Sequence, residues 1–235
     1  AYNAPHTPIQ PPSDWLEKVK SRQPGITDRR AKLVALIEHM DAGIGRVLRS
    51  LRDSGMDERT IVVFTSDNGG QINVGANNGS LRDGKQSMYE GGLRIPGCIR
   101  VPGETKAASS TDAVCTTADF LPTLVELAGG RVDAPIDGIS LRPLLADPDH
   151  AWPEREVYFV RREGGIRYAG LTIEGLLWGD LKLVHNLPTS QLELFDLSID
   201  PNETTDLAQE RPKELREMVR RLQLHIQRGG AVPWQ

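Results

Sequence analysis

Two long segments of the chain carry apolar residues at the spacing of an amphipathic helix. The first covers residues 28–54, with Thr27 or Asp28 as its N-cap and Gly55 after its last turn. The second covers residues 213–228. In both, the apolar positions recur every three or four residues, so the pattern predicts two helices with one buried face each. These positions are Leu33, Leu36, Ile37, Met40, Ile44, Val47, Leu48 and Leu51 in the first segment, and Leu215, Met218, Val219, Leu222 and Ile226 in the second.

Two short apolar runs predict strands, and a third helix follows them. Residues 61–65 have no polar alternation, which is typical of a parallel strand covered on both faces. A second strand is predicted over residues 98–101, which lie between two prolines. Residues 116–128 predict a helix that is capped by Thr116 or Thr117 and ended by two glycines.

Two other stretches have no apolar period. Residues 1–26 are rich in proline and predict an extended loop, because proline fixes φ and lacks an amide donor. Residues 69–92 are rich in glycine, asparagine and serine, and predict a long irregular loop. Loops of that length in a compact domain are usually functional or disordered.

The pattern changes after a turn-rich stretch at residues 147–156. Beyond it, short alternating or aromatic segments separated by turns predict an antiparallel sheet, which the second long helix follows. We therefore expect an α/β fold: a partial parallel sheet with flanking helices in a domain over residues 1–150, and a subdomain with a small antiparallel sheet and a terminal helix over residues 151–235.

Composition and charge exclude several classes of protein. A hydrophobic content of 38% and a charged content of 26% are those of a globular chain, not a disordered one. The net charge is −4, with an excess of two acidic residues in each of the two expected domains, so no basic region suggests nucleic acid. No apolar run approaches the roughly 18 residues of a membrane span. Cys98 and Cys115 are too few for a disulfide framework.

The most specific local feature is Ser66-Asp67-Asn68-Gly69, directly after the first predicted strand. Ligands of open α/β sheets gather at the carboxyl ends of strands. Carboxylate and amide oxygens suit Ca²⁺ or Mg²⁺ better than zinc. Taken alone, the same four residues also fit an ordinary Asx turn, with Gly69 supplying a positive φ. The tetrapeptide therefore needs support from the rest of the chain.

That support comes from further motifs, which follow one another along the chain in the order and at the spacing of a known family. They lie at residues 81–97, 116–130, 137–145 and 193–208, and the segment NAPHTP precedes them. Together with TSDNGG they resemble the later portion of the sulfatase family, whose fold is of the alkaline-phosphatase type. The resemblance covers nearly the whole chain. The four motifs read LRDGKQSMYEGGLRIPG, TTADFLPTLVELAGG, DGISLRPLL and ELFDLSIDPNETTDLA.

The resemblance implies roles for four residues. Asp67 and Asn68 match two ligands of the family's calcium ion, with Mg²⁺ as the weaker alternative. Lys85 matches the lysine that binds the sulfate group. His6 matches a histidine that contacts the sulfate ester and can protonate the leaving oxygen. The implied substrate is a sulfated small molecule or glycan, and the resemblance alone favours a periplasmic or secreted location.

Other residues of these motifs are expected to be structural. Glu90, with the two glycines after it, matches a family stretch that we assign to loop geometry and ion pairing. Asp119 and Thr123 match positions at a helix start. His225 lies off the apolar face of the last helix, which predicts an exposed side chain.

The family's nucleophile has no match in this sequence. It is a formylglycine made from Cys or Ser in the pattern Cys/Ser-x-Pro-x-Arg, and no cysteine or serine here stands in that pattern. The early Asp-Asp pair that completes the family's calcium shell is also unmatched. We therefore expect the chain to hold part of a split site, whose partner is an N-terminal portion of the same protein, and to be inactive by itself.

Two alternatives stay open. The first is a phosphoric or phosphonic ester hydrolase of the same superfamily, since its members share acidic metal ligands. The second is a homologue without catalytic activity. Lys85 in the pattern GK…EGG-x-R-x-P favours sulfate, and the presence of His6, Asp67, Asn68 and Lys85 together argues against a scaffold that has lost its chemistry.

Overall fold

The structure, a computed structural model, describes residues 2–163 and 171–230. The chain forms two compact units. Unit 1 comprises residues 2–45, 66–95, 155–163 and 171–230, and unit 2 comprises Arg46–Thr65 and Pro96–Glu154. The chain passes from unit 2 to unit 1 after Glu154, inside the predicted boundary at residues 147–156. The assignment of domains 1–150 and 151–235 stays a prediction.

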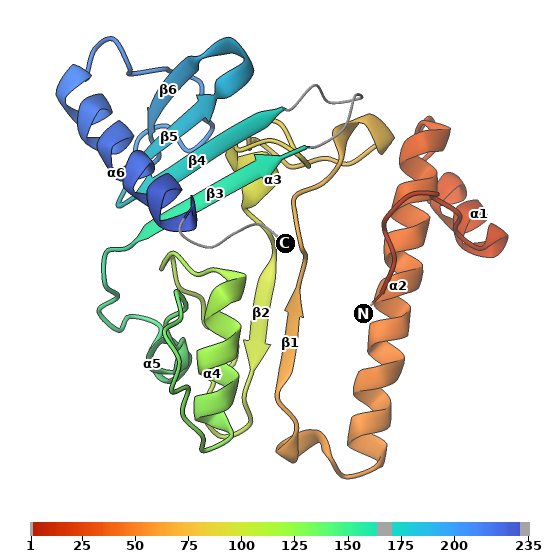
Figure 1. Cartoon of the computed structure of the whole chain (residues 1–235). Helices are drawn as coiled ribbons and strands as arrows, with labels where there is room; N and C mark the ends of the chain where they lie inside the picture. The colour runs from red at the N-terminus through yellow and green to blue at the C-terminus, as the bar shows by residue number, and fades with distance from the viewer. Residues whose placement is uncertain (1, 164–170, 231–235) are drawn as a thin grey trace. The chain divides into compact units, whose positions relative to one another are not determined.

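A four-stranded antiparallel sheet and a long helix form the core of unit 1 (Figure 1). The strands follow one another in chain order, and helix α6 packs on one face of the sheet. This confirms the predicted antiparallel sheet and terminal helix. The elements are β3 (Glu156–Arg162), β4 (Thr172–Trp178), β5 (Leu181–Asn186), β6 (Gln191–Asp196) and α6 (Pro212–Gly230).

Alternation along the strands divides the buried side chains between two faces. Leu176, Leu183 and Leu194 pack against α6. Val184 and Phe195 lie on the other face, together with Met88 from the loop that precedes helix α3 (Glu90–Leu93). The sheet is therefore covered on both faces, by α6 and by the segment around Met88.

The first two helices of the chain correct one expectation. Helix α2 (Asp28–Asp53) agrees with the predicted helix, but α1 (Ser13–Arg22) lies where an extended loop was expected. The prolines of this region precede residue 13 or follow residue 22, so they flank a helix without interrupting it. Val19 of α1 is fully buried against Ala31 and Ala35 of α2. That burial stabilises a helix that the proline content concealed.

Unit 2 corrects a second expectation. Strands β1 (Val62–Thr65) and β2 (Gly97–Arg100) lie where strands were predicted, but they pair antiparallel, with Val62 opposite Arg100. The side chain of Phe64 is 40% exposed, so β1 is not covered on both faces either. An unbroken apolar run predicts burial but carries no information about the direction of the partner strand.

The helices of unit 2 agree better with the sequence. Thr116 and Asp119 form a capping box at the short 3-10 helix η3 (Thr117–Asp119), which leads into α4 (Phe120–Leu127). The hydroxyl of Thr123 donates to the carbonyl of Asp119 and accepts from the amide of Leu141, next to helix α5 (Arg142–Ala146). These contacts confirm the structural roles expected of Asp119 and Thr123.

At the level of fold class, the chain is α/β with a small antiparallel sheet and a C-terminal helix, as expected. Among the helices described, none is both long enough and apolar enough to cross a bilayer. Cys98 and Cys115 are exposed, and neither is in a disulfide within the described residues.

Candidate functional site

Asp67 and Asn68 occupy the turn that follows β1. The side chain of Asp67 is exposed, and no other described residue forms a hydrogen bond or ion pair with it. Asn68 donates from its Nδ2 to the carbonyl of Gly69 at 3.0 Å, and Ser66 donates from its hydroxyl to the carbonyl of Asn68 at 2.9 Å. These bonds fix the turn and leave the Oδ1 atom of Asn68 as an acceptor. The turn therefore presents carboxylate and amide oxygens that nothing in the described chain occupies.

Main-chain contacts join this turn to the loop that carries Lys85. The amide of Gly69 donates to the carbonyl of Gly92 at 2.9 Å, and the amide of Lys85 donates to the carbonyl of Gly70 at 3.1 Å. Asn78 supports the same junction, because its side-chain amide both donates to and accepts from the backbone of Gly70. The structure thus brings the turn at Asp67 and Asn68 together with the loop of residues 82–90, here called the Lys85 loop.

The junction is too close to admit side chains. A Cβ on Gly69 would lie 1.8 Å from the carbonyl oxygen of Gly91, and a Cβ on Gly84 would lie 2.2 Å from that of Gly70. Both distances are far inside van der Waals contact. The glycines of DNGG and DGK…EGG therefore permit a backbone approach that no other residue allows.

Lys85 is half-buried, and its ammonium has no ion-pair partner among the residues that the structure describes. Its main-chain amide bonds to Gly70, so the backbone is fixed at this position, whereas no carboxylate pairs with the side chain in the described chain. A lysine that is fixed in this way and lacks a counterion is available for an anionic ligand.

His6 is placed apart from these residues by its contacts. It is exposed, and its Nδ1 atom lies 2.8 Å from the carbonyl oxygen of Thr7. A carbonyl can only accept, so this contact makes Nδ1 the donor and leaves Nε2 free. Within the described chain, no contact joins His6 to Asp67, Asn68 or Lys85, and its role in the same site stays a prediction.

The oxygen atoms at the turn are the type of ligand that a hard divalent cation prefers, but they are too few to complete its coordination shell. Ca²⁺ takes six to eight oxygen ligands, and Asp67 with Asn68 supplies at most three. In the described part of the chain, no group of three or more His, Cys, Asp or Glu residues could hold a metal ion. The two residues therefore constitute at most part of a cation site.

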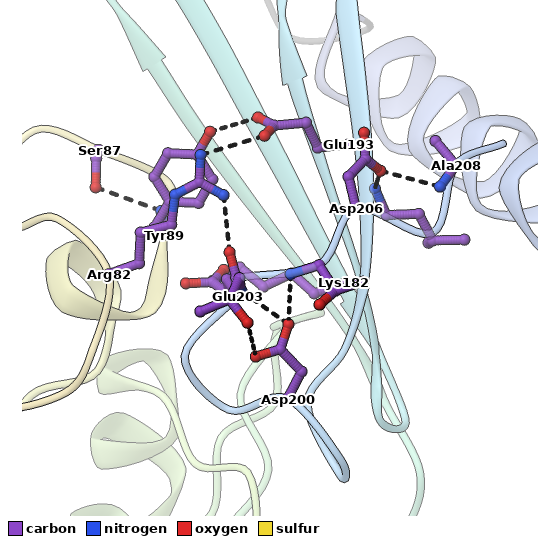
Figure 2. A network of polar contacts seen from close by, with 12 residues as sticks. Arg82, Ser87, Tyr89, Lys182, Glu193, Asp200, Glu203, Asp206 and Ala208 are labelled. Atoms are coloured by element: carbon purple, nitrogen blue, oxygen red, sulfur yellow. Dashed lines mark hydrogen bonds and ion pairs between the residues drawn. The ribbon is translucent and has the colours of Figure 1, made fainter. Parts of the chain in front are cut away.

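A buried charged cluster contacts the Lys85 loop, and only Glu90 among its members is expected from the sequence to form an ion pair. Lys182 of β5 is 1% exposed, and its ammonium lies 2.7 Å from a carboxylate oxygen of Glu90 and 2.7 Å from one of Glu203, the latter without hydrogen-bond alignment. Burial raises the pKa of the Glu203 carboxyl, against the opposing effect of Lys182. Figure 2 shows Lys182 beside Glu203, with Arg82 and Tyr89 facing Glu193.

The ion pair expected of Glu90 is thus confirmed, whereas its partners were not foreseen. Lys182 and Glu193 alternate with apolar residues along their strands, which predicts a solvent-facing side. Val184 and Phe195 share that side and are buried. The apolar residues Val184 and Phe195 on this face were the sequence signal that another segment of the chain covers the face.

The expectation for His225 was wrong. Its Nε2 atom lies 2.7 Å from a carboxylate oxygen of Glu156, and its ring stacks on that of Tyr158 with centroids 5.6 Å apart. The side chain is 20% exposed. The face beside the apolar stripe of α6 is covered by β3, which the helical pattern alone does not reveal.

Comparisons with known proteins agree with the motifs. The sequence model of the Sulfatase family matches residues 1–130, and that of N-sulphoglucosamine sulphohydrolase, C-terminal, matches residues 82–229. A sulfatase of Formosa agariphila is 32% identical over 233 residues, which cover 91% of this chain and 42% of the relative.

Solved structures show the same fold. The crystal structure of Ps i-CgsB in complex with k-i-k-neocarrahexaose is similar with a TM-score of 0.84 and 27% identity, over 95% of this chain and 48% of that one. BT4656 in complex with its substrate D-glucosamine-2-N,6-O-disulfate is similar with a TM-score of 0.70 and 27% identity, over 84% and 41%. The chain therefore spans less than half the length of these relatives. With a family match over more than half of its residues, the chain belongs to the sulfatase family.

Proposed function

We propose that the protein containing this chain hydrolyses sulfate esters, and that Asp67, Asn68 and Lys85 form part of its active site. The observation that carries the proposal is the junction between Gly70 and Lys85, which sets a lysine without a counterion beside a turn with free oxygen ligands. Membership of the sulfatase family supports the reaction class.

The residues have complementary tasks in this proposal. Asp67 and Asn68 bind a divalent cation, Ca²⁺ in preference to Mg²⁺, together with ligands from outside this chain. When bound, the cation neutralises charge on the sulfate oxygens. Lys85 donates hydrogen bonds to the non-bridging oxygens, where negative charge grows in the transition state. His6, with Nε2 free of other contacts, donates a proton to the leaving oxygen when it is protonated.

The attacking group belongs to sequence outside these residues. No Cys or Ser of the chain stands in Cys/Ser-x-Pro-x-Arg, so the proposal assigns a formylglycine to another part of the protein. The residues described here then bind and orient the sulfate group and protonate the leaving group. We accordingly propose that the 235 residues alone are inactive and that an N-terminal portion completes the site.

The proposed substrate is a sulfated glycan. Support comes from BT4656, whose substrate is D-glucosamine-2-N,6-O-disulfate. It comes also from an N-acetylglucosamine-6-O-sulfatase of Bacteroides thetaiotaomicron, which is 31% identical over a match that covers 74% of this chain and 31% of the relative. Both proteins act on, or are named for, sulfated glucosamine.

Assays of the natural protein that contains this sequence test the reaction class. With Ca²⁺ present, we expect turnover of an aryl sulfate and of a glucosamine sulfate, and at most weak turnover of the matching aryl phosphate and phosphonate. Faster turnover of the phosphorus esters would instead identify a phosphoric or phosphonic ester hydrolase. No turnover of any ester, with a metal-loaded and folded protein, would identify a homologue without catalytic activity.

A further inference from the structure

We propose that Lys182 and Glu203 are positioning residues for the candidate site. Lys182 forms a buried ion pair with the Glu90 side chain, and Glu203 accepts a hydrogen bond from the Glu90 amide. Together these contacts hold the Lys85 loop, residues 82–90, against the sheet of unit 1. The proposal rests on the proposed function for its effect on rate. Its structural part, the fixing of the loop, can be tested without any activity.

Lys182 provides the first attachment. It reaches Glu90 at one end of the Lys85 loop and Glu203 in the turn after β6, each at 2.7 Å, from a strand where it is 1% exposed. A buried ammonium without partners would be strongly destabilising, and a packed apolar core would often be equally stable. The fixed geometry of Lys182, rather than added stability, is therefore what these charges contribute.

Glu203 provides the second attachment and binds both ends of the loop. Its Oε2 atom accepts from the amide of Glu90 at 2.6 Å, and its carbonyl accepts from Nη1 of Arg82 at 2.9 Å. Glu203 is fully buried and has a φ of +54°, a left-handed conformation that fixes the direction of its side chain and carbonyl. Loss of its carboxylate thus frees one end of the loop.

Arg82 and Tyr89 fix the loop further through Glu193 of β6. The guanidinium of Arg82 lies over the ring of Tyr89 at 3.7 Å from its centroid and pairs with Glu193 at 3.3 Å. The hydroxyl of Tyr89 donates to the same carboxylate (Figure 2). The loop is therefore attached at residues 82, 89 and 90, on both sides of Lys85.

The constraint reaches the candidate site through the glycine junction. The amide of Lys85 bonds to Gly70, and Gly91 approaches Asp83 so closely that a Cβ would lie 2.2 Å from its carbonyl oxygen. With no free space between these backbones, a shift of the loop displaces Lys85 relative to Asp67. A displacement of about 1 Å can lower the rate about 10²-fold even when its cause lies far from the chemistry.

A double-mutant cycle in the natural protein tests the effect on rate. Glu203→Gln is nearly isosteric, but its single amide oxygen cannot serve both Lys182 and the amide of Glu90. Lys182→Met removes the charge and keeps the length. In the wild-type background we expect either change to lower kcat about 10- to 100-fold, with little change in KM. In a Lys85→Ala background the same change should lower kcat by less than about threefold, because its effect acts through Lys85.

Amide exchange tests the fixing of the loop without activity. We expect Glu203→Gln to speed exchange at the amides of Lys85 and Glu90 while β4 stays protected. Arg211→Met is the control, since Arg211 pairs with Asp196 of β6 at 2.8 Å and has no contact with the loop among the described residues. It should leave the exchange of both amides and kcat unchanged.

Several outcomes would overturn the proposal. Equal losses of kcat in both backgrounds would show a general effect on the fold, and unchanged exchange at Lys85 in Glu203→Gln would show that the loop does not need this attachment. Where Lys182→Met fails to fold, Glu203→Gln decides alone. If the parent protein shows no sulfate ester turnover, the proposed function fails, whereas the exchange result still decides whether these residues hold the loop.

Discussion

Asp67 and Lys85 are held by the backbone around them, and their side chains make no ion pairs within the described chain. This arrangement suits residues whose charges act on a ligand. By contrast, Lys182 and Glu203 are buried and paired. Substitution of Asp67 or Lys85 is therefore expected to remove a contact with the ligand and to leave the fold intact. Substitution of Lys182 or Glu203 is expected to remove a structural contact.

Asp67→Ala and Lys85→Ala should lower activity for different reasons. If Asp67 binds the cation as proposed, Asp67→Ala in the natural protein should lower the bound Ca²⁺, and excess Ca²⁺ should restore part of the activity. Lys85→Ala keeps the Ca²⁺ content and lowers kcat about 10²- to 10³-fold, the scale of losing one donor to a developing anion. Metal analysis with a calcium titration of activity separates the two, with the exposed surface change Asp41→Ala as control. Equal metal loss in both variants would contradict these roles.

Gly69→Ala should destabilise the chain because its Cβ would meet the carbonyl oxygen of Gly91. Overpacking of this kind typically costs about 1–3 kcal/mol. The matched control is Gly97→Ala, since a Cβ on Gly97 has no neighbour within 4 Å and its φ is not positive. Urea unfolding of both variants measures the difference. A Gly69→Ala variant as stable as Gly97→Ala would show that the junction is looser than described.

The sequence could indicate Asp67, Asn68 and Lys85 because each stands inside a motif with a fixed pattern. Glu203 also stands inside a motif, at residues 193–208, but the motif does not reveal that its side chain is buried and binds the amide of Glu90, 113 residues away. Lys182 stands in none of the motifs, and its partner Glu90 lies 92 residues away. A lysine between leucines in a strand looks like a solvated residue until the covering loop is known. Its burial is a tertiary property.

At the scale of elements, α6 and β3 are joined by charge as well as by apolar contact. The carboxylate of Glu156 in β3 forms hydrogen bonds with the side chains of Arg221 and His225 in α6. Burial acts to raise the pKa of the Glu156 carboxyl, but the two hydrogen bonds and charges outweigh it and hold the pKa below its ordinary value of 4.5. The contact therefore depends on an ionised Glu156.

The sign of the pH dependence follows from that shift. Since the folded-state pKa of Glu156 is depressed, its stabilising effect is complete well above pH 4.5 and is lost as the pH falls through the folded-state pKa. We expect Glu156→Gln to lower the urea midpoint near neutral pH and to flatten its decrease below about pH 4.5. Glu217 also pairs with Arg221, and the hydrogen bond from Arg220 lowers the pKa of Glu217 to about 2. Glu154→Gln, an exposed change outside α6, should leave the curve unchanged. A parallel loss at all pH values in Glu156→Gln would contradict the assignment.

Elements with a strong local pattern were predictable, and elements fixed by distant partners were not. The apolar stripe of α2 and the capping box before α4 are local signals, and both helices lie where they were predicted. The direction of β1 depends on β2, which is more than thirty residues away, and α1 depends on burial of Val19 against α2. Neither contact can be predicted from the local sequence pattern.

At the scale of the whole chain, the two units differ in how much apolar surface they bury. Within the described residues of unit 2, the buried hydrophobic side chains are Val101, Leu141 and Leu144. Phe64 is 40% and Leu121 54% exposed in the same unit. Unit 1 has a sheet that is buried on both faces. Because burial of apolar surface is the main stabilising term, unit 2 should be the less stable part.

Hydrogen exchange of the isolated 235 residues tests that difference. We expect the amides of β1 and β2, which form a two-stranded sheet, to exchange at least about 10²-fold faster than those of β5 and β6, because two strands alone are only marginally stable. If further sequence of the natural protein covers Phe64, the amides of β1 and β2 should become protected there while those of β5 and β6 change little. Equal protection of both sheets in the isolated chain would show that unit 2 is stable without that cover and would remove the physical reason for expecting it.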